Sequence, residues 1–385
     1  MKHRILIVNG NLNVGGVEYA LVNLLRAFDS NKYEIDLLLL QRGYDYLADI
    51  PSHVKVICKE SDDAGGPLFY CIKKNIRNNN WFCLNYRVRQ IARRFIGCRM
   101  AYKFADALLG VKKKYDTAIA FRPGICSDIV GYAINATRKI AWWHHGDMRI
   151  GITKKRLLST WLRFDEVVAV SDGTAEMLKK HFPNLTIKVI PNIIDAKHIC
   201  YKSQQSNPDC EYDVECLKIV TIGRLVEEKH IEDAVTAAAL LKTSGVSFRW
   251  HIIGDGILYD EIKSQIDNAR LNDTVILLGA QVNPYPWIKN ADMMVHTSHV
   301  ESFGLVILEA MALGTPCVAA RSIGAESIID GKNGILAEPD VDSLVDAIMT
   351  LHNDRQKQSA IVQNAFKTVE QYSADKIIKL IEKEL

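Results

Sequence analysis

The sequence predicts an α/β fold built from two parallel β-sheets, each in a domain of its own. A chain of 385 residues has the length of two ordinary domains rather than one. Short apolar runs alternate with helical patterns from end to end, as expected when helices connect the strands of a parallel sheet. With 48% hydrophobic and 24% charged residues, each half can bury a core, which excludes a disordered or low-complexity chain.

Strands in the first half are predicted where short runs of leucine and β-branched residues show no strict polar–apolar alternation. This pattern is typical of strands that are buried on both faces of a sheet. A helix should follow the first strand and begin near Tyr19. The predicted strands are residues 4–8, 35–40, 54–57, 117–121, 140–143, 167–170 and 188–190.

The second half repeats the pattern after a polar stretch at residues 202–215. We therefore expect a first domain at residues 1–195, a linker at 196–216 and a second domain at 217–370. Sheets of this kind bind ligands at the carboxyl ends of their strands, which predicts a cleft between the domains. The predicted strands of the second domain are 218–222, 249–253, 275–278, 293–296 and 317–319, and the predicted helices are 231–242, 259–269, 304–313, 342–351 and a pair within 355–385.

Composition also restricts the setting of the protein. No window reaches the roughly 20 apolar residues of a membrane span, and the first apolar run is too short for a signal peptide, so we expect a cytoplasmic chain. The nine cysteines include no Cys-x-x-Cys pair, and no histidines stand at zinc-finger spacing. This predicts free thiols rather than disulfides or a structural zinc site.

Charge is distributed unevenly along the chain. Residues 1–195 carry 30 Lys and Arg against 18 Asp and Glu, whereas the remainder carries 18 against 27. A basic half joined to an acidic half favours contact of one domain with an anionic membrane surface, and disfavours nucleic acid as a partner. The basic amphipathic pattern from Tyr86 to Lys103 could lie on such a surface, although a core-packed helix with a solvated basic face explains it equally well.

Two glutamates eight residues apart give the strongest functional signal. Eight helical steps separate two residues by about 80° and 12 Å, so Glu301 must precede the helix that carries Glu309. Unpaired N–H groups from Phe303 to Val306 at the helix start could then bind a phosphate, with the glutamates accepting from hydroxyls on either side. Alternatively, Glu301 only contributes to the helix start and Glu309 lies on a solvated face.

Arg224 and Lys229 lie in the loop after the predicted strand 218–222. Two cations at this spacing could clamp a diphosphate and stabilise the charge that develops on a leaving group. They could equally be ordinary surface partners of Glu227 or Glu228.

Two other strand ends carry candidate ligand contacts. Gly15 and Gly16 follow the first strand and permit close approach of the backbone to a ligand, although a tight turn would use them too. They lack the G-x-G-x-x-G spacing of dinucleotide sites, which disfavours a nicotinamide cofactor. His144 and His145 directly follow the predicted strand 140–143. Because neighbouring side chains of extended backbone point to opposite sides, we expect at most one of them to face the cleft.

Asp340 and Asp342 resemble an Asp-x-Asp pair that holds a metal, but they stand directly before an apolar helical pattern. Helix capping is the favoured interpretation. No serine-hydrolase, zinc-protease or Walker motif is present in the sequence.

In their order along the chain, these motifs resemble the retaining glycosyltransferases of family GT4. The resemblance is most specific between Lys218 and Asp346 and weakest between Lys59 and Val111. It implies a GT-B fold, in which two Rossmann-like parallel-sheet domains face a central cleft and a C-terminal helix, here residues 371–385, crosses back onto the first domain.

The resemblance also implies roles for individual residues. Glu301 and Glu309 match the E-x7-E pair of the family, the first near the donor sugar and the second on the ribose. The match departs from the family at Ile193 and at His230, which stand where glycine is usual or frequent. The resemblance assigns catalysis to His144, Glu301, Arg224 and Lys229, and donor binding to Gly15, Gly16, Arg224, Lys229, Phe303, Gly304, Leu305 and Glu309, with His145 as the alternative histidine.

A protein of this kind would move a hexose from a UDP- or GDP-sugar to a sugar or lipid-linked acceptor, with retention at the anomeric carbon and without a metal or other cofactor. The basic surface of the first domain suggests a lipid-linked acceptor, as in the assembly of surface polysaccharide, with the protein peripheral on the inner face of the membrane. A sugar-nucleotide epimerase of similar architecture and a non-catalytic nucleotide-binding protein are the alternatives.

Overall fold

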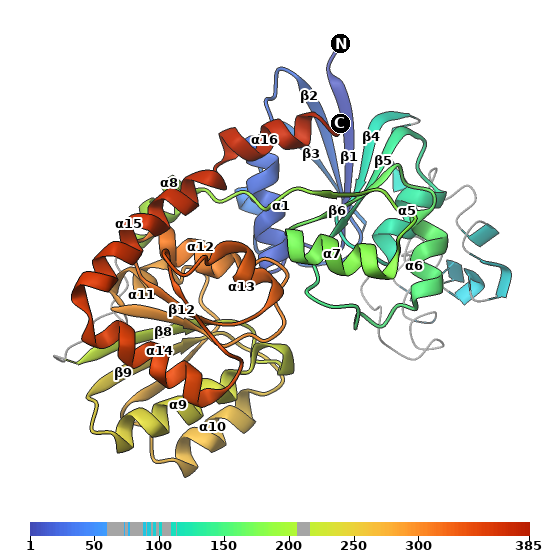
Figure 1. The fold of residues 1–385 in the computed structure, drawn as a ribbon. Coiled ribbons are helices and arrows are strands. Elements are labelled where there is room, and N and C mark those ends of the chain that lie inside the picture. Colours follow the sequence, from blue (N-terminus) through green and yellow to red (C-terminus); the bar gives the residue numbers. More distant parts are fainter. Residues whose placement is uncertain are drawn as a thin grey trace.

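The computed structural model describes residues 1–59, 109–112, 114–205 and 216–385, together with residues 73, 76, 77, 88, 89, 91–93, 95–97, 100 and 101. Most of the basic segment from Tyr86 to Lys103, and residues 206–215 of the expected linker, therefore lie outside the described residues. The described chain forms two lobes with a sheet in each (Figure 1).

The first lobe contains a seven-stranded parallel sheet in the order β3-β2-β1-β4-β5-β6-β7. Both faces of its first strand along the chain, β1 (His3–Asn9), are buried: Ile5 and Ile7 pack into a core with helix α1, whereas Leu6 and Val8 pack into a second core with helix α5. The strands are β1 (His3–Asn9), β2 (Tyr33–Leu39), β3 (Val54–Cys58), β4 (Tyr115–Ala120), β5 (Ala136–Trp143), β6 (Glu166–Ala169) and β7 (Ile187–Val189), and the helices are α1 (Gly16–Ala27), the 3-10 turn η1 (Leu47–Asp49), α5 (Ile125–Tyr132), α6 (Lys154–Trp161) and α7 (Asp172–His181).

The second lobe contains a six-stranded parallel sheet in the order β10-β9-β8-β11-β12-β13. The two sheets confirm the predicted α/β fold. The strands are β8 (Leu217–Ile222), β9 (Phe248–Ile253), β10 (Val275–Gly279), β11 (Met293–His296), β12 (Cys317–Ala320) and β13 (Ile335–Ala337). The helices are α8 (Ala196–Ser203), η3 (Glu227–Lys229), α9 (Ile231–Thr243), α10 (Tyr259–Asn268), α11 (Tyr285–Asn290), α12 (Leu305–Ala312), α13 (Ile323–Ile328), α14 (Val341–Asn353) and α15 (Arg355–Gln371). The last helix, α16 (Ala374–Glu382), returns to the first lobe.

Every strand predicted from the sequence has a counterpart, and the differences have local causes. Strand β5 begins at Ala136 rather than at residue 140, because its first half is partly exposed and therefore shows no apolar run. Strand β13 was not predicted, since three residues at a sheet edge give too short a pattern. Helix α8 occupies the first part of the segment that was expected to be a linker.

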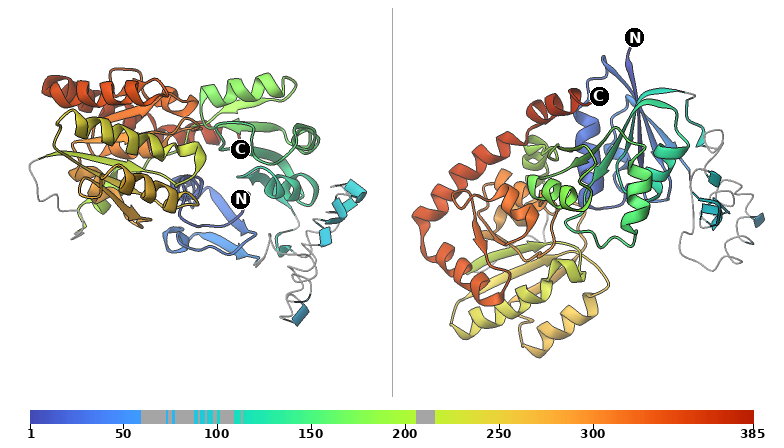
Figure 2. Two further views of the ribbon diagram at one scale, coloured as in Figure 1. Left: turned by 90° about the horizontal axis from the view of Figure 1, so that it is seen from below. Right: turned by 45° about the vertical axis from the view of Figure 1, so that its right-hand side comes forward.

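Two segments connect the lobes, and they run side by side. The backbone N–H of Ile194 donates to the carbonyl of Tyr372 at 2.9 Å, which joins the segment before α8 to the bend between α15 and α16. Helix α16 then packs against α1, and Glu382 near its end accepts hydrogen bonds from Tyr33 and Lys32, both at 3.2 Å. Figure 2 shows helices α15 and α16, in red, reaching from the second lobe to the first.

The Asp-x-Asp pair acts as expected from its position before a helix. The carboxylate of Asp340 accepts from the backbone N–H of Ser343 at 2.8 Å and caps helix α14. The cysteines that the structure describes, residues 58, 126, 200, 216 and 317, are all free thiols, in agreement with the prediction.

Candidate active site

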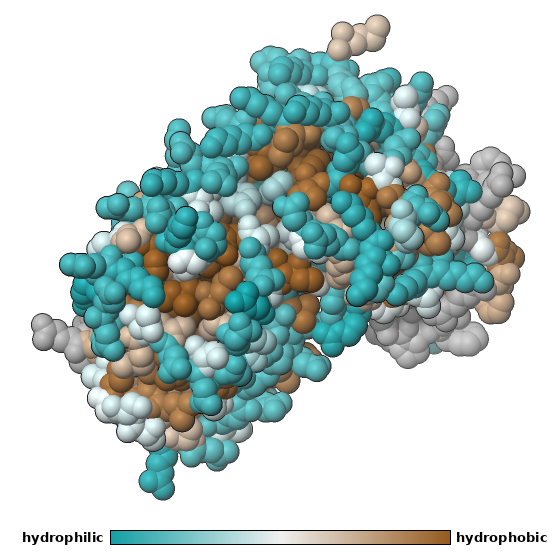
Figure 3. Space-filling model, in the orientation of Figure 1, coloured by the Kyte–Doolittle hydropathy of each residue, from teal (hydrophilic) through white to brown (hydrophobic). Residues whose placement is uncertain are grey.

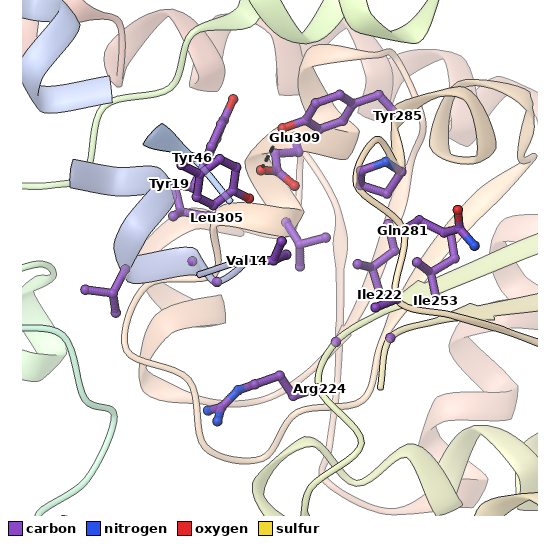
Figure 4. Close-up of a pocket in the computed structure, with 18 of the residues that line it drawn as sticks. Val14, Tyr19, Tyr46, Ile222, Arg224, Ile253, Gln281, Tyr285, Leu305 and Glu309 are labelled. Atoms are coloured by element: carbon purple, nitrogen blue, oxygen red, sulfur yellow. Dashed lines mark hydrogen bonds between the residues drawn. The ribbon is translucent and has the colours of Figure 1, made fainter. Parts of the chain in front are cut away.

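A cavity of about 540 Å³ lies between the lobes and is lined by loops from both (Figure 4). Both sheets direct these loops to the cavity in the same way, because each sheet reverses its strand order beside its first strand, between β1 and β4 and between β8 and β11. Of the residues predicted for the site, all but His145 line the cavity: Gly15, Gly16, His144, Arg224, Lys229, Glu301, Phe303, Gly304, Leu305 and Glu309.

The start of helix α12 presents backbone N–H groups to the cavity. Gly304 is the N-cap residue, with a left-handed φ of 93°, and no side chain caps this helix start. A Cβ atom at Gly304 would lie 3.0 Å from Cδ1 of Ile307, so glycine suits both the backbone and the space. The N–H groups of Leu305 and Val306 are consequently available to an anionic ligand.

Lys229 and Glu301 form an ion pair at the edge of the same cavity. Nζ of Lys229 donates to Oε2 of Glu301 at 2.6 Å, and Nε2 of His296 lies 3.4 Å from the same oxygen. Burial alone would raise the pKa of the Glu301 carboxyl, but Lys229 and His296 outweigh it and hold the pKa well below its ordinary value. Glu301 is therefore an anion at neutral pH. His296, at the end of β11, was not singled out from the sequence.

Arg224 is exposed to the cavity and forms no ion pair with any residue that the structure describes. Its loop is held by the loop after β9: the N–H of Leu225 donates to Asp255 O at 2.9 Å. A Cβ atom at Gly254 or Gly256 would lie 1.8 or 2.2 Å from a carbonyl oxygen of the Arg224 loop. Glycine at these two positions therefore lets the two loops pack together.

The first lobe contributes a second uncapped helix start, that of α1. Gly15 is its N-cap residue without a side-chain cap, and a Cβ atom at Gly16 would lie 3.8 Å from Leu305 at the start of α12. The carboxylate of Glu18, in the first turn of α1, lies beneath Gly15 and pairs with Arg122 from the loop after β4. Arg122 was missed in the sequence, although it directly follows a predicted strand.

The structure distinguishes between the two adjacent histidines. His144 lines the cavity and packs on Phe121 and Trp142, whereas His145 does not line it and meets the edge of Trp143. Burial and the nearby Arg122 cation lower the pKa of His144 well below its ordinary value, so its imidazole is neutral at pH 7. Its Nε2 is buried and has no hydrogen-bond partner among the described residues.

Glu309 lies at the opposite end of the cavity from Arg224, among three tyrosines (Figure 4). Tyr285 donates a long hydrogen bond of 3.4 Å to its Oε1, and Tyr19 and Tyr46 approach from the first lobe. Burial without a neighbouring cation raises the pKa of the Glu309 carboxyl to about 7. The tyrosine cluster gave no signal in the sequence, because its members come from three separate segments.

The segment that carries Glu301 belongs to the second lobe and forms hydrogen bonds directly with the first lobe. The carbonyl of Ser302 accepts from Ser171 at 2.8 Å and from Thr174 at 3.1 Å, both at the start of α7. The hydroxyl of Ser302 donates to His144 O at 2.9 Å. A Cβ atom at Gly146 would lie 2.7 Å from the backbone of Glu301, so the halves of the site pack backbone to backbone.

Comparison with known proteins identifies the family. A family model described as "Glycosyl transferases group 1" matches residues 212–368. The N-acetyl-alpha-D-glucosaminyl L-malate synthase of Bacillus anthracis is 31% identical over 272 residues, which cover 67% of this chain and 70% of that protein. The chain belongs to the group 1 glycosyltransferases.

Two further similarities agree with this assignment. The poly(glycerol-phosphate) alpha-glucosyltransferase of Bacillus subtilis (strain 168) is 33% identical over 165 residues, which cover 42% of this glycosyltransferase but only 24% of that protein. The structure of HepE from Anabaena, in complex with UDP and glucose, superimposes with a TM-score of 0.72 at 19% identity over 99% of this chain and 98% of that one. The likeness confirms the GT-B fold.

The pKa of Glu309 gives this glycosyltransferase a testable pH dependence. Because the carboxyl keeps its proton to a higher pH in the folded state, Glu309 lowers the stability as the pH rises from about 4.5 to about 7. Glu309→Gln removes this effect. The melting temperature of the variant, relative to that of the wild type, should therefore be higher at pH 8 than at pH 5. The exposed Glu370→Gln serves as the control. An equal difference at both pH values would contradict the buried, protonated state of Glu309.

Proposed function

We propose that this glycosyltransferase transfers a hexose from a UDP-sugar to a hydroxyl of a sugar or lipid-linked acceptor, with retention at the anomeric carbon and without a metal ion. One observation carries the proposal: Arg224, Lys229 and the uncapped start of α12 line the same cavity. Two cationic side chains and a helix start are what a diphosphate leaving group requires when no divalent cation neutralises it.

The choice of UDP over GDP rests on similarity. HepE, which shares the fold over nearly the whole chain, was crystallised with UDP and glucose. A role in glycoconjugate or polysaccharide biosynthesis agrees with the names of the curated relatives.

The transfer is proposed to follow a front-face path. The acceptor oxygen forms a bond to the anomeric carbon as the bond from that carbon to the β-phosphate oxygen breaks, and the departing phosphate oxygen takes the proton of the acceptor. Neutral His144 would bind a hydroxyl of the donor sugar through its unpartnered Nε2. Glu301 is less suited to act as a covalent nucleophile, because its carboxylate is already paired with Lys229 at 2.6 Å.

A panel of UDP-, GDP- and ADP-sugars, tested by thermal shift and by release of nucleotide onto an acceptor, examines this proposal. We expect UDP to raise the melting temperature, and we expect turnover at saturating donor to be the same in EDTA as with Mg²⁺ or Mn²⁺. A new sugar nucleotide formed from donor alone would indicate an epimerase. Binding of nucleotide without turnover would indicate a non-catalytic protein.

Variants of the clamp complete this experiment. Arg224→Ala and Lys229→Ala should each reduce kcat by about 10²- to 10³-fold, since each removes a group that stabilises the leaving diphosphate. Lys263→Ala, an exposed lysine in helix α10, is the matched control. Turnover of both clamp variants at the wild-type rate would reject the site.

Membrane contact is a further part of the proposal, supported by the first lobe. Val88, Phe95, Ile96 and Met100 are exposed, Phe95 to 82%, and Figure 3 shows apolar surface at this edge of the lobe beside the atoms drawn in grey. The sequence of the same segment is rich in arginine, a composition that favours contact with lipid phosphates. No helix among the described residues is long and apolar enough to span a bilayer.

Vesicle sedimentation tests this contact. We expect the protein to sediment with vesicles that contain phosphatidylglycerol and to remain in the supernatant with phosphatidylcholine alone, because the attraction is electrostatic. Phe95→Ser should weaken the sedimentation. Equal behaviour with both kinds of vesicle would refute the membrane contact.

A further inference from the structure

Two histidines and an aspartate meet directly beside the Lys229 clamp. His230 and Asp233 come from the start of α9, and His299 comes from the loop after β11. A potential ligand atom of each lies within 4.8 Å of those of the other two. Nε2 of His299 is 3.0 Å from Oδ2 of Asp233, and the two imidazole rings stack with their centroids 3.7 Å apart. None of the three residues lines the cavity described above.

The backbone of His230 is not one that a histidine prefers. Its φ and ψ are both 46°, in the left-handed region, where residues other than glycine are disfavoured by about 1 to 2 kcal/mol. Among the described residues other than glycine, only His230 and Arg270 have a positive φ. A histidine held at this strained position, with its ring against a second histidine, indicates that the side chain itself has a role.

The chemistry of these groups suits a transition-metal ion. Imidazole nitrogens with a carboxylate oxygen are ligands of Zn²⁺ and related ions, whereas Mg²⁺ and Ca²⁺ prefer oxygen alone. Oε1 of the neighbouring Glu232 lies 3.3 Å from Nδ1 of His230, but this residue is not one of the three whose ligand atoms all approach one another. Zinc bonds of about 2.0 to 2.2 Å would require the two stacked rings to turn until a nitrogen of each points to the same ion.

We propose that His230, Asp233 and His299 bind a zinc-like divalent ion that braces the segment carrying Lys229. Two hydrogen bonds already join the loop after β11 to η3, directly before α9: Thr297 donates to Lys229 O at 2.7 Å, and Ser298 donates to Glu228 O at 3.1 Å. An ion across the histidines would add a third, stronger link and fix the position of the clamp. It would take no part in the transfer itself, because its ligands lie outside the cavity.

Titration of the metal tests the site without any measurement of activity. The full chain, without a histidine tag and stripped with EDTA, is titrated with ZnCl₂ and separately with MgCl₂ by calorimetry. We expect one equivalent of zinc to bind and to raise the melting temperature, and magnesium to give no heat. His230→Gly and His299→Ala should each weaken zinc binding by more than about 100-fold. Loss of a residue that only hydrogen-bonds to a metal ligand has a smaller effect.

The variants are chosen so that misfolding cannot imitate the result. Glycine is the residue that the left-handed backbone favours, so His230→Gly should melt in EDTA at or above the temperature of the wild type. His53→Ala, an exposed histidine in the first lobe, is the control and should bind zinc as the wild type does. No zinc binding, or equal affinity in His230→Gly and wild type, would overturn the site.

The bracing role rests on the proposed function and has its own readout. Zinc should tighten the binding of UDP to the wild type and leave UDP binding to His230→Gly unchanged. If zinc binds at the histidines and UDP affinity does not respond, the brace is refuted while the metal site stands. If UDP binds under neither condition, the proposed function fails, and the zinc titration still decides the site.

Discussion

The packing of residues 301–304 between the lobes is the constraint on which the rest of the site depends. The carbonyl of Ser302 accepts two hydrogen bonds from the start of α7, and its hydroxyl donates to the carbonyl of His144. These bonds fix the position of the uncapped start of α12 against the first lobe. Because helix N–H groups act only on a charge close to them, this docking decides where a diphosphate can lie.

The two glutamates of the site show how the surroundings of one residue type set its charge. Both are substantially buried, yet the pKa of Glu301 is lowered and that of Glu309 is raised to about 7. The difference arises because Lys229 lies against Glu301, whereas Glu309 has only tyrosines around it. A neutral carboxyl can both donate and accept, which suits it to a pair of neighbouring hydroxyls, while the anion keeps the lysine in place.

The sequence predicted those features that arise from local pattern. Apolar runs located the strands, and helix geometry placed Glu301 before α12 and Glu309 within it. Features that depend on distant segments were missed. Gly146 is needed because a strand end of the first lobe packs on the backbone of Glu301, and the histidine cluster exists because α9 and the loop after β11 meet. Neither has a signature within one window, and the resemblance treated His230 only as a departure.

We propose that the start of α12 binds a pyrophosphate without a divalent ion. A crystal structure of the protein with UDP, grown in EDTA, tests it most directly. We expect the β-phosphate within hydrogen-bond distance of the N–H groups of Leu305 or Val306, with Arg224 and Lys229 on its other oxygens. A nucleotide bound elsewhere, or one that enters this cavity only when a divalent cation bridges its phosphates, would contradict the claim.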